Sequence, residues 1–155
     1  MKSTLPEVHE FLSQRTLALA GVSRSGKKFG NAILKSLKQN GYSVFPIHPV
    51  AEAIEGEKCY ASLGILPEKV GGLIICLPSV QTEIVLHQAL AAGINRVWLQ
   101  QGSESYAALR FCEHHGISVV HGQCILMFVE PVGSIHGFHR WVWRLIGKYP
   151  SLSQT

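Results

Sequence analysis

A short apolar run followed at once by a glycine-rich basic turn constrains this sequence more than any other stretch. Residues 17–20 are all leucine or alanine, which is typical of a strand buried on both faces of a parallel sheet. Gly21 ends the run, and residues 23–28 then supply hydroxyl groups, positive charge and accessible backbone N–H groups. A helix is expected from Asn31, so the turn lies where helix N-termini bind phosphate oxygens. The segment predicts a strand, a phosphate-binding turn and a helix start, and a solvated loop rich in small residues is the alternative.

Two nucleotide-binding motifs nearly fit this turn. Residues 21–28 follow the P-loop pattern up to Lys28, which stands where a serine or threonine would bind magnesium. The next apolar strand ends in 77–79, Leu-Pro-Ser, and offers no acidic magnesium partner, so we do not expect NTP hydrolysis. The glycines at 21, 26 and 30 do not form the dinucleotide fingerprint, and the second strand ends in His48 instead of an acidic residue for a ribose hydroxyl. NAD is therefore disfavoured, and an NAD(P)-linked oxidoreductase is kept as an alternative function.

Composition narrows the class of protein. With 155 residues, 46% hydrophobic and only 15% charged, we expect one compact domain over residues 1–155. The net charge is +4, but outside 24–28 the cations are spread along the chain, which favours a localised anion site over a nucleic-acid surface. No apolar run approaches the roughly 20 residues of a membrane helix, and the N-terminus lacks a signal-peptide core. We expect a cytoplasmic protein that binds neither nucleic acid nor membrane.

The four cysteines lie at positions 59, 76, 112 and 124, without a C-x-x-C pair or a zinc-finger spacing. We expect reduced thiols, with Cys76 in a core strand. Cys124 is expected to be a small buried residue. The alternative is a thiol-redox protein that uses Cys124 together with a bound cofactor, because positive charge or a helix N-terminus lowers a thiol pKa.

Strands and helices alternate along the chain. Strands are expected at 17–20, 42–47, 70–77, 96–99 and 117–121, and helices at 6–14, 31–38, 80–92 and 104–115, with less regular structure over 50–70. The first helix should cover an edge of the sheet. Ser79 is expected to cap the third helix, with Ile84, Val85, Leu86, Ala89 and Leu90 facing inward. This alternation predicts an α/β, Rossmann-like, doubly wound fold with about five parallel strands and helices on both faces.

In such a fold a ligand lies outside the carboxyl ends of the strands. The loops 21–30, 47–51, 77–80, 100–103 and 122–125 should therefore converge. Residues 134–147 predict a C-terminal aromatic helix that packs on the sheet or a partner subunit. Its His136 and His139 could share a metal, and its basic aromatic face could lie on a membrane surface. We favour ordinary packing and no metal site, because no third ligand has matching spacing.

Several motifs together resemble a known family. They are the stretches 21–31 (GVSRSGKKFGN), 41–49 (GYSVFPIHP), 55–63 (EGEKCYASL), 77–78 (LP), 97–104 (VWLQQGSE) and 119–127 (VVHGQCILM). In this order they resemble the small bacterial CoA-binding-domain proteins. These are in turn similar to the nucleotide-binding domain of the succinyl-CoA synthetase α subunit.

The resemblance implies roles for individual residues. Residues 23–26 would hold the CoA diphosphate, 77–79 would line the nucleotide or pantetheine path, and 122–124 would lie near the thiol arm. One departure is Ala51, where the synthetase has a lysine, so a 3′-phosphate contact must come from elsewhere, with Arg24, Lys27 and Lys28 as the candidates. The synthetase's phosphorylated histidine belongs to a second domain, so we do not expect ligase chemistry.

The sequence thus predicts non-catalytic binding of coenzyme A or an acyl-CoA, with a homodimer or a partner enzyme left open. The residues expected to contact the cofactor are Gly21, Ser23, Arg24, Ser25, Gly26, Lys27, His48, Leu77, Pro78, Ser79 and Gln123. No catalytic residue is assigned.

Overall fold

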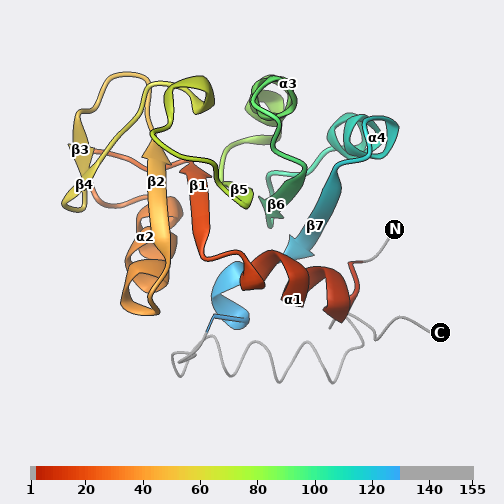
Figure 1. Cartoon of the computed structure of the whole chain (residues 1–155), viewed down its shortest axis with the longest axis horizontal. Coiled ribbons are helices and arrows are strands. Elements are labelled where there is room, and N and C mark those ends of the chain that lie inside the picture. The colour runs from red at the N-terminus through yellow and green to blue at the C-terminus, as the bar shows by residue number, and fades with distance from the viewer. Residues whose placement is uncertain (1–2, 130–155) are drawn as a thin grey trace.

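Five parallel strands form the central sheet of the protein, which we describe from a computed structural model over residues 3–129 (Figure 1). The spatial order is β2-β1-β5-β6-β7. The strands are β1 (Thr16–Ala20), β2 (Ser43–Ile47), β5 (Gly72–Ile75), β6 (Arg96–Gln100) and β7 (Ser118–Gln123). All four neighbouring pairs are parallel. The predicted α/β, Rossmann-like fold is therefore confirmed.

Helices cover both faces of this sheet. One face carries α1 (Leu5–Ser13), α2 (Phe29–Gln39) and the short 3-10 helix η2 (Ile125–Met127). The other carries α3 (Ser79–Ala91), α4 (Tyr106–His114) and the 3-10 helix η1 (Leu63–Ile65). Because side chains alternate along β1, Leu17 and Leu19 pack towards α2 while Ala18 and Ala20 pack towards α3. This explains why the run 17–20 is apolar at every position.

The first helix packs onto a face of the sheet, so the prediction that it covers an edge is wrong. A capping box between Thr4 and Glu7 starts α1. Val8 and Phe11 are buried, and the Phe11 ring meets the ring of Trp98 on β6 edge-to-face at 5.6 Å. The helix therefore covers β6 and β7 from below in Figure 1.

Helix α3 turns only part of the predicted face to the sheet: Leu86 and Ala89 are buried and Val85 packs against the core as expected, but Ile84 and Leu90 are exposed. Its buried residues are Thr82, Leu86 and Ala89, whereas Ile84 is 62% exposed and Leu90 is 38% exposed. The helix has apolar residues all round, so the pattern alone could not select its inner face. Ser79 is also its first residue and not its cap: Pro78 takes the cap position, and no side chain caps this end.

The irregular stretch after β2 contains a small hairpin. Strands β3 (Ala53–Ile54) and β4 (Glu57–Lys58) pair antiparallel, and Tyr60 then pairs with Ile47 at the outer side of β2. Tyr60 donates its backbone N–H to the Pro46 carbonyl at 3.0 Å. The hairpin is thereby held beside β2, next to α2.

The strand order reverses between β1 and β5, and this position determines where a ligand can bind. In an open parallel sheet the crevice lies at such a switch point, outside the carboxyl ends of the strands. Because all neighbouring strands are parallel, the turns after β1, β2, β5, β6 and β7 all leave from the carboxyl edge of the sheet. The predicted aromatic helix over 134–147, with His136 and His139, lies outside the described residues. Within 3–129, no helix has the length and apolar character needed to cross a membrane.

Candidate functional site

Two glycines let three backbone segments meet at the switch point. Gly21 has φ +116°, and a Cβ there would lie 2.1 Å from the carbonyl oxygen of Cys76, the residue after β5. A Cβ on Gly30 would lie 2.2 Å from the carbonyl oxygen of Gly21. Neither position has room for a side chain, because the neighbouring atoms are backbone. The first turn of α2 is thus packed directly against the end of β1, which itself lies against the end of β5.

The turn between these glycines is braced by its own hydroxyl groups. The Ser23 and Ser25 Oγ atoms are 2.9 Å apart. The backbone N–H of Ser25 donates to Ser23 Oγ at 3.2 Å, and that of Lys27 donates to Ser25 Oγ at 3.4 Å. Gly26, with φ +72°, donates its N–H to the Ser23 carbonyl at 3.2 Å. The two serines predicted to bind phosphate therefore also shape the turn that would receive it.

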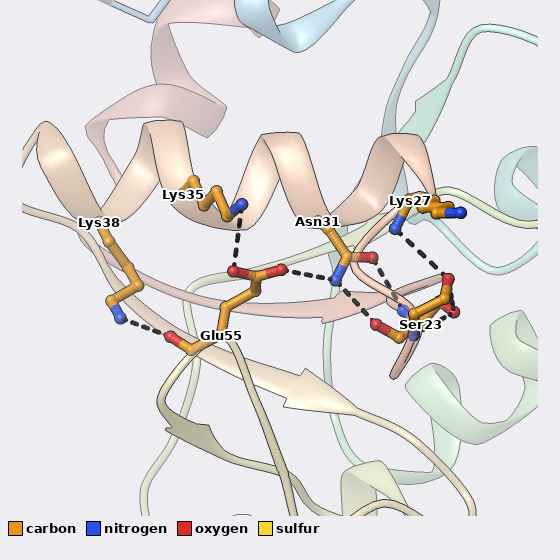
Figure 2. A network of polar contacts seen from close by, with 7 residues as sticks. Ser23, Lys27, Asn31, Lys35, Lys38 and Glu55 are labelled. Carbon is orange, nitrogen blue, oxygen red and sulfur yellow. Dashed lines mark hydrogen bonds and ion pairs between the residues drawn. The ribbon is translucent and has the colours of Figure 1, made fainter.

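A buried asparagine fixes the start of the turn. Asn31 lies in the first turn of α2 and is 1% exposed. Its Oδ1 accepts the Ser23 backbone N–H at 2.9 Å, and its Nδ2 donates to the Ser23 carbonyl at 2.8 Å. The same Nδ2 donates to Glu55 Oε1 at 3.1 Å, as Figure 2 shows. One amide side chain thus holds both backbone groups of Ser23.

Three exposed cations follow on the turn. Arg24, Lys27 and Lys28 are all exposed, and none forms an ion pair with an acidic side chain within 3–129. Lys28 is the N-cap of α2, which has neither a side-chain cap nor an acidic residue in its first turn. Positive charge and a helix N-terminus therefore lie together at the switch point, an arrangement that suits an anion.

His48, at the end of β2, borders this positive region. Its Nδ1 accepts the backbone N–H groups of Val50 at 3.1 Å and Ala51 at 2.9 Å, which requires that nitrogen to be unprotonated. Burial, and then the positive charges of Arg24 and Lys28, lower the pKa of His48 below its ordinary 6.5. His48 is therefore neutral at pH 7 and stabilises the turn after β2.

A hollow of about 820 Å³ opens beside His48. It is lined by the turn after β2, the β3–β4 hairpin and η1, and its wall includes Tyr60 and the exposed apolar side chains of Val50 and Ile65. This volume falls within the range of small-molecule sites. The hollow extends the site from the basic turn towards the outer side of β2.

The turn after β5 is tied to the turn after β6. Leu77 donates its backbone N–H to Ser103 Oγ at 3.1 Å, and Thr82 Oγ1 donates to the Ser103 carbonyl at 2.7 Å. Leu77 and Ser79 are half-buried, and Pro78 is exposed. Residues 77–79, which we predicted to line the nucleotide or pantetheine path, therefore flank the switch point opposite the basic turn.

The turn after β7 is more buried than we expected for a ligand contact. Gln123 is 5% exposed and still belongs to β7, and its carbonyl accepts the Trp98 indole N–H at 3.4 Å. Ile125 donates its backbone N–H to Gln100 Oε1 at 3.1 Å, which joins this turn to β6. All five predicted loops thus lie at one end of the sheet, but Gln123 faces the interior.

The cysteines at this end are poor candidates for redox chemistry. All four cysteines of the chain are free. Burial raises the pKa of the Cys124 thiol, although a hydrogen bond to Gln100 acts in the opposite direction. Burial, and then Cys124, raise the pKa of Cys76, which lies just beyond β5 and is half-buried instead of being a core strand residue. The expectation that Cys124 is a buried packing residue is borne out.

Four residues of the site escaped the sequence analysis: Gly30, Asn31, Glu55 and Ser103. Gly30 had a signal, because it is the third glycine of the turn. Asn31 was recognised only as a helix start. Glu55 and Ser103 act through partners 24 and 26 residues away, and only the fold brings these pairs together.

Comparison with known proteins shows the family and the fold that this chain shares with them. Residues 15–130 match the family model described as CoA binding domain. The chain is 28% identical over 128 residues to the ADP-forming acetate–CoA ligase II of Archaeoglobus fulgidus. The aligned region covers 75% of this chain and 19% of the ligase. The chain spans 11–20% of the length of the acetate–CoA ligases that it matches.

Solved structures of similar proteins have the same fold as this chain. A conserved hypothetical protein of Pyrococcus furiosus is 39% identical, with a TM-score of 0.69, over 72% of this chain and 96% of that protein. A Thermus thermophilus protein is 30% identical, with a TM-score of 0.70, over 77% of this chain and 91% of that protein. The family expected from the sequence motifs is confirmed.

Proposed function

The chain belongs to the CoA binding domain family, and on that premise we propose that it binds coenzyme A or an acyl-CoA at the carboxyl ends of its parallel strands without catalysing a reaction on it. One observation carries the proposal. The exposed cations Arg24, Lys27 and Lys28 lie on the turn at the start of α2, beside the switch point, without an acidic partner in the described chain. A diphosphate is the part of CoA that such a turn would hold.

The surroundings of β2 favour a phosphorylated ribose over a free one. A NAD-binding site usually offers a carboxylate at this strand end, to accept ribose hydroxyls. Here the strand ends in His48, with the charges of Arg24 and Lys28 close enough to lower its pKa. The 3′-phosphate of CoA would meet positive charge there, in place of the lysine missing at Ala51. NADP also carries a phosphate on its ribose, so this positive charge would favour NADP over NAD.

The hollow beside His48 would receive the adenine ring. Its apolar wall of Val50 and Ile65 and the Tyr60 side chain suit a flat, weakly polar base. The pantetheine arm would then run towards residues 77–79, on the other side of the switch point. This places the thiol end of CoA away from the basic turn and leaves the acyl group unspecified.

Absence of catalysis is part of the proposal. A nucleophile or proton carrier at this end would have to be Cys76, Cys124 or His48. The pKa values of both thiols are raised, and the His48 Nδ1 lone pair is already used by two backbone N–H groups. Substrate binding alone lowers no barrier unless the transition state is bound more tightly. The ADP-forming acetate–CoA ligases that this chain resembles are chains several times longer.

Calorimetric titration with CoA, dephospho-CoA, NADP and NAD tests the binding. We expect CoA to bind most tightly, dephospho-CoA more weakly and NAD weakest. Equal or tighter binding of NAD would overturn the assignment. A parallel incubation with CoA, ATP, magnesium and carboxylic acids should form no thioester. Thioester that disappears in Cys124→Ser or His48→Ala would show that the protein is an enzyme.

A further inference from the structure

We propose that Glu55 is a positioning residue for the basic turn: its carboxylate, presented by the β3–β4 hairpin, locks the Asn31 amide that holds Ser23. This inference rests on the proposed function, since it concerns how the same turn is kept ready for a phosphate. Glu55 lies outside the turn in sequence, yet Figure 2 shows it pointing between Asn31 and Lys35 on α2.

The backbone conformation of Glu55 is the first observation that supports this role. Glu55 has φ +52° and is the only residue other than glycine with a positive φ within 3–129. It is followed by Gly56 at φ +76°, so the hairpin turns through two left-handed residues. Asparagine or glycine is preferred at the first of these positions, whereas glutamate is strained there. A strained residue persists where its surroundings hold it, and such residues gather at functional sites.

Three contacts with α2 hold the strained Glu55 residue in place. Oε1 accepts from Asn31 Nδ2 at 3.1 Å, and Oε2 forms an ion pair with Lys35 Nζ at 3.2 Å. Lys38 Nζ donates to the Glu55 backbone carbonyl at 3.1 Å. The side chain is only 18% exposed, and its Oε1 lies 3.4 Å from where a Cβ of Gly26 would be. Both carboxylate oxygens and the carbonyl are thus engaged by α2, at the edge of the basic turn.

The carboxylate reinforces the orientation of the Asn31 amide that the two backbone groups of Ser23 also require. An amide side chain has a donating nitrogen and an accepting oxygen on the same planar group. A carboxylate accepts only, so Glu55 requires the nitrogen to face it. The oxygen must then face the Ser23 N–H, which is the arrangement seen. Without Glu55, one N–H of a buried amide would lose its acceptor, and the two backbone groups of Ser23 alone would hold the amide in place.

The charges around Glu55 are also consistent with a positioning role beside an anion site. A carboxylate beside an anion site would repel the ligand unless it were neutralised. Lys35 neutralises Glu55, and Lys38 pairs with Glu57 at 2.7 Å. The two lysines of α2 are therefore committed to the hairpin. Arg24, Lys27 and Lys28 are left for the ligand.

Three variants separate the effect of the Glu55 carboxylate from the effect of the rest of the hairpin. Glu55→Asn suits the left-handed backbone but is too short to hold the Asn31 amide. Glu55→Gln keeps an acceptor and removes the charge. Glu57→Gln, on the same hairpin, removes the same charge but faces Lys38 only. For each, we would measure the unfolding free energy, the hydrogen-exchange rate of the Ser23 amide by NMR without ligand, and CoA affinity by calorimetry.

In Glu55→Asn we expect Ser23 to exchange about tenfold faster and CoA to bind about tenfold more weakly, as loss of a hydrogen bond to a charged group implies. The unfolding free energy should change little, because relief of the strained backbone offsets the lost contacts with Asn31 and Lys35. Glu55→Gln should restore most of the Ser23 protection, and Glu57→Gln should behave like the parent. Parent-like Ser23 exchange and CoA affinity in Glu55→Asn, or equal effects in Glu57→Gln, would overturn the inference. If Ser23 responds as expected while the parent does not bind CoA, the positioning role stands and the proposed function fails.

Discussion

Adding one methyl group at Gly30 should loosen the contact on which the whole site depends. The position is helical, so alanine would ordinarily stabilise α2 by about 1 kcal/mol. Here the new Cβ would lie 2.2 Å from the Gly21 carbonyl oxygen and 2.8 Å from its carbonyl carbon. Ordinary contact is about 3.5 Å, so α2 and β1 would have to separate by about 1 Å. Overpacking of this kind costs about 1–3 kcal/mol.

The two effects have opposite signs, and we expect overpacking to win. Gly30→Ala should lower the unfolding free energy by up to about 2 kcal/mol, which is the overpacking cost less the helix gain, and should weaken CoA binding. Urea unfolding followed by circular dichroism measures the first, and calorimetry measures the second. Gly64→Ala is the matched control, because nothing lies within 4 Å of its Cβ position and its φ is not left-handed. A Gly30→Ala protein as stable as the parent, or more stable, would refute the close packing of α2 on Gly21.

Two further predictions concern charge. Arg24→Ala should weaken CoA binding by about 1.5–3 kcal/mol, the size of a charge-assisted phosphate contact, with little effect on folding, whereas Arg110→Ala on α4 should leave calorimetric affinity unchanged. Parent-like affinity in Arg24→Ala would make Arg24 an ordinary surface residue. Because the pKa of His48 is lowered in the folded state, its contribution to stability is complete above its ordinary pKa of 6.5 and is lost as pH falls below 6.5 through the lowered folded-state pKa. The difference in unfolding free energy between the parent and His48→Gln should therefore shrink on acidification from pH 8 to pH 5, and a constant difference would contradict the structure.

The strands could be predicted because burial on both faces leaves a clear trace in a sequence. Residues 17–20 have no polar position, and the glycine that follows marks where the chain must turn. The alternation of strands with helices then predicts a parallel sheet, and the sheet places the turns together. The site as a location therefore followed from the sequence.

The details of the site could not be obtained in this way. Periodicity fails for α3, because Val80 and Ile84 are apolar yet exposed, while polar Thr82 is buried through its bond to Ser103. The β3–β4 hairpin escaped because its strands have two residues each and its turn is Glu-Gly, not the familiar Asn-Gly. Its contact with Asn31 depends on the packing of a hairpin against a helix 24 residues earlier in the chain.

An NMR titration of the isotopically labelled protein with CoA tests the central claim most directly, because it reports where the ligand binds as well as whether it binds. We expect the largest amide shifts at residues 23–31, at His48 and at residues 77–79, with saturation at one CoA per chain. The groove between α4 and β7, lined by Tyr106, Leu109 and Val119, should be unaffected. Shifts concentrated in that groove, or no saturable shifts around Arg24, would contradict binding of CoA at the carboxyl ends of the strands.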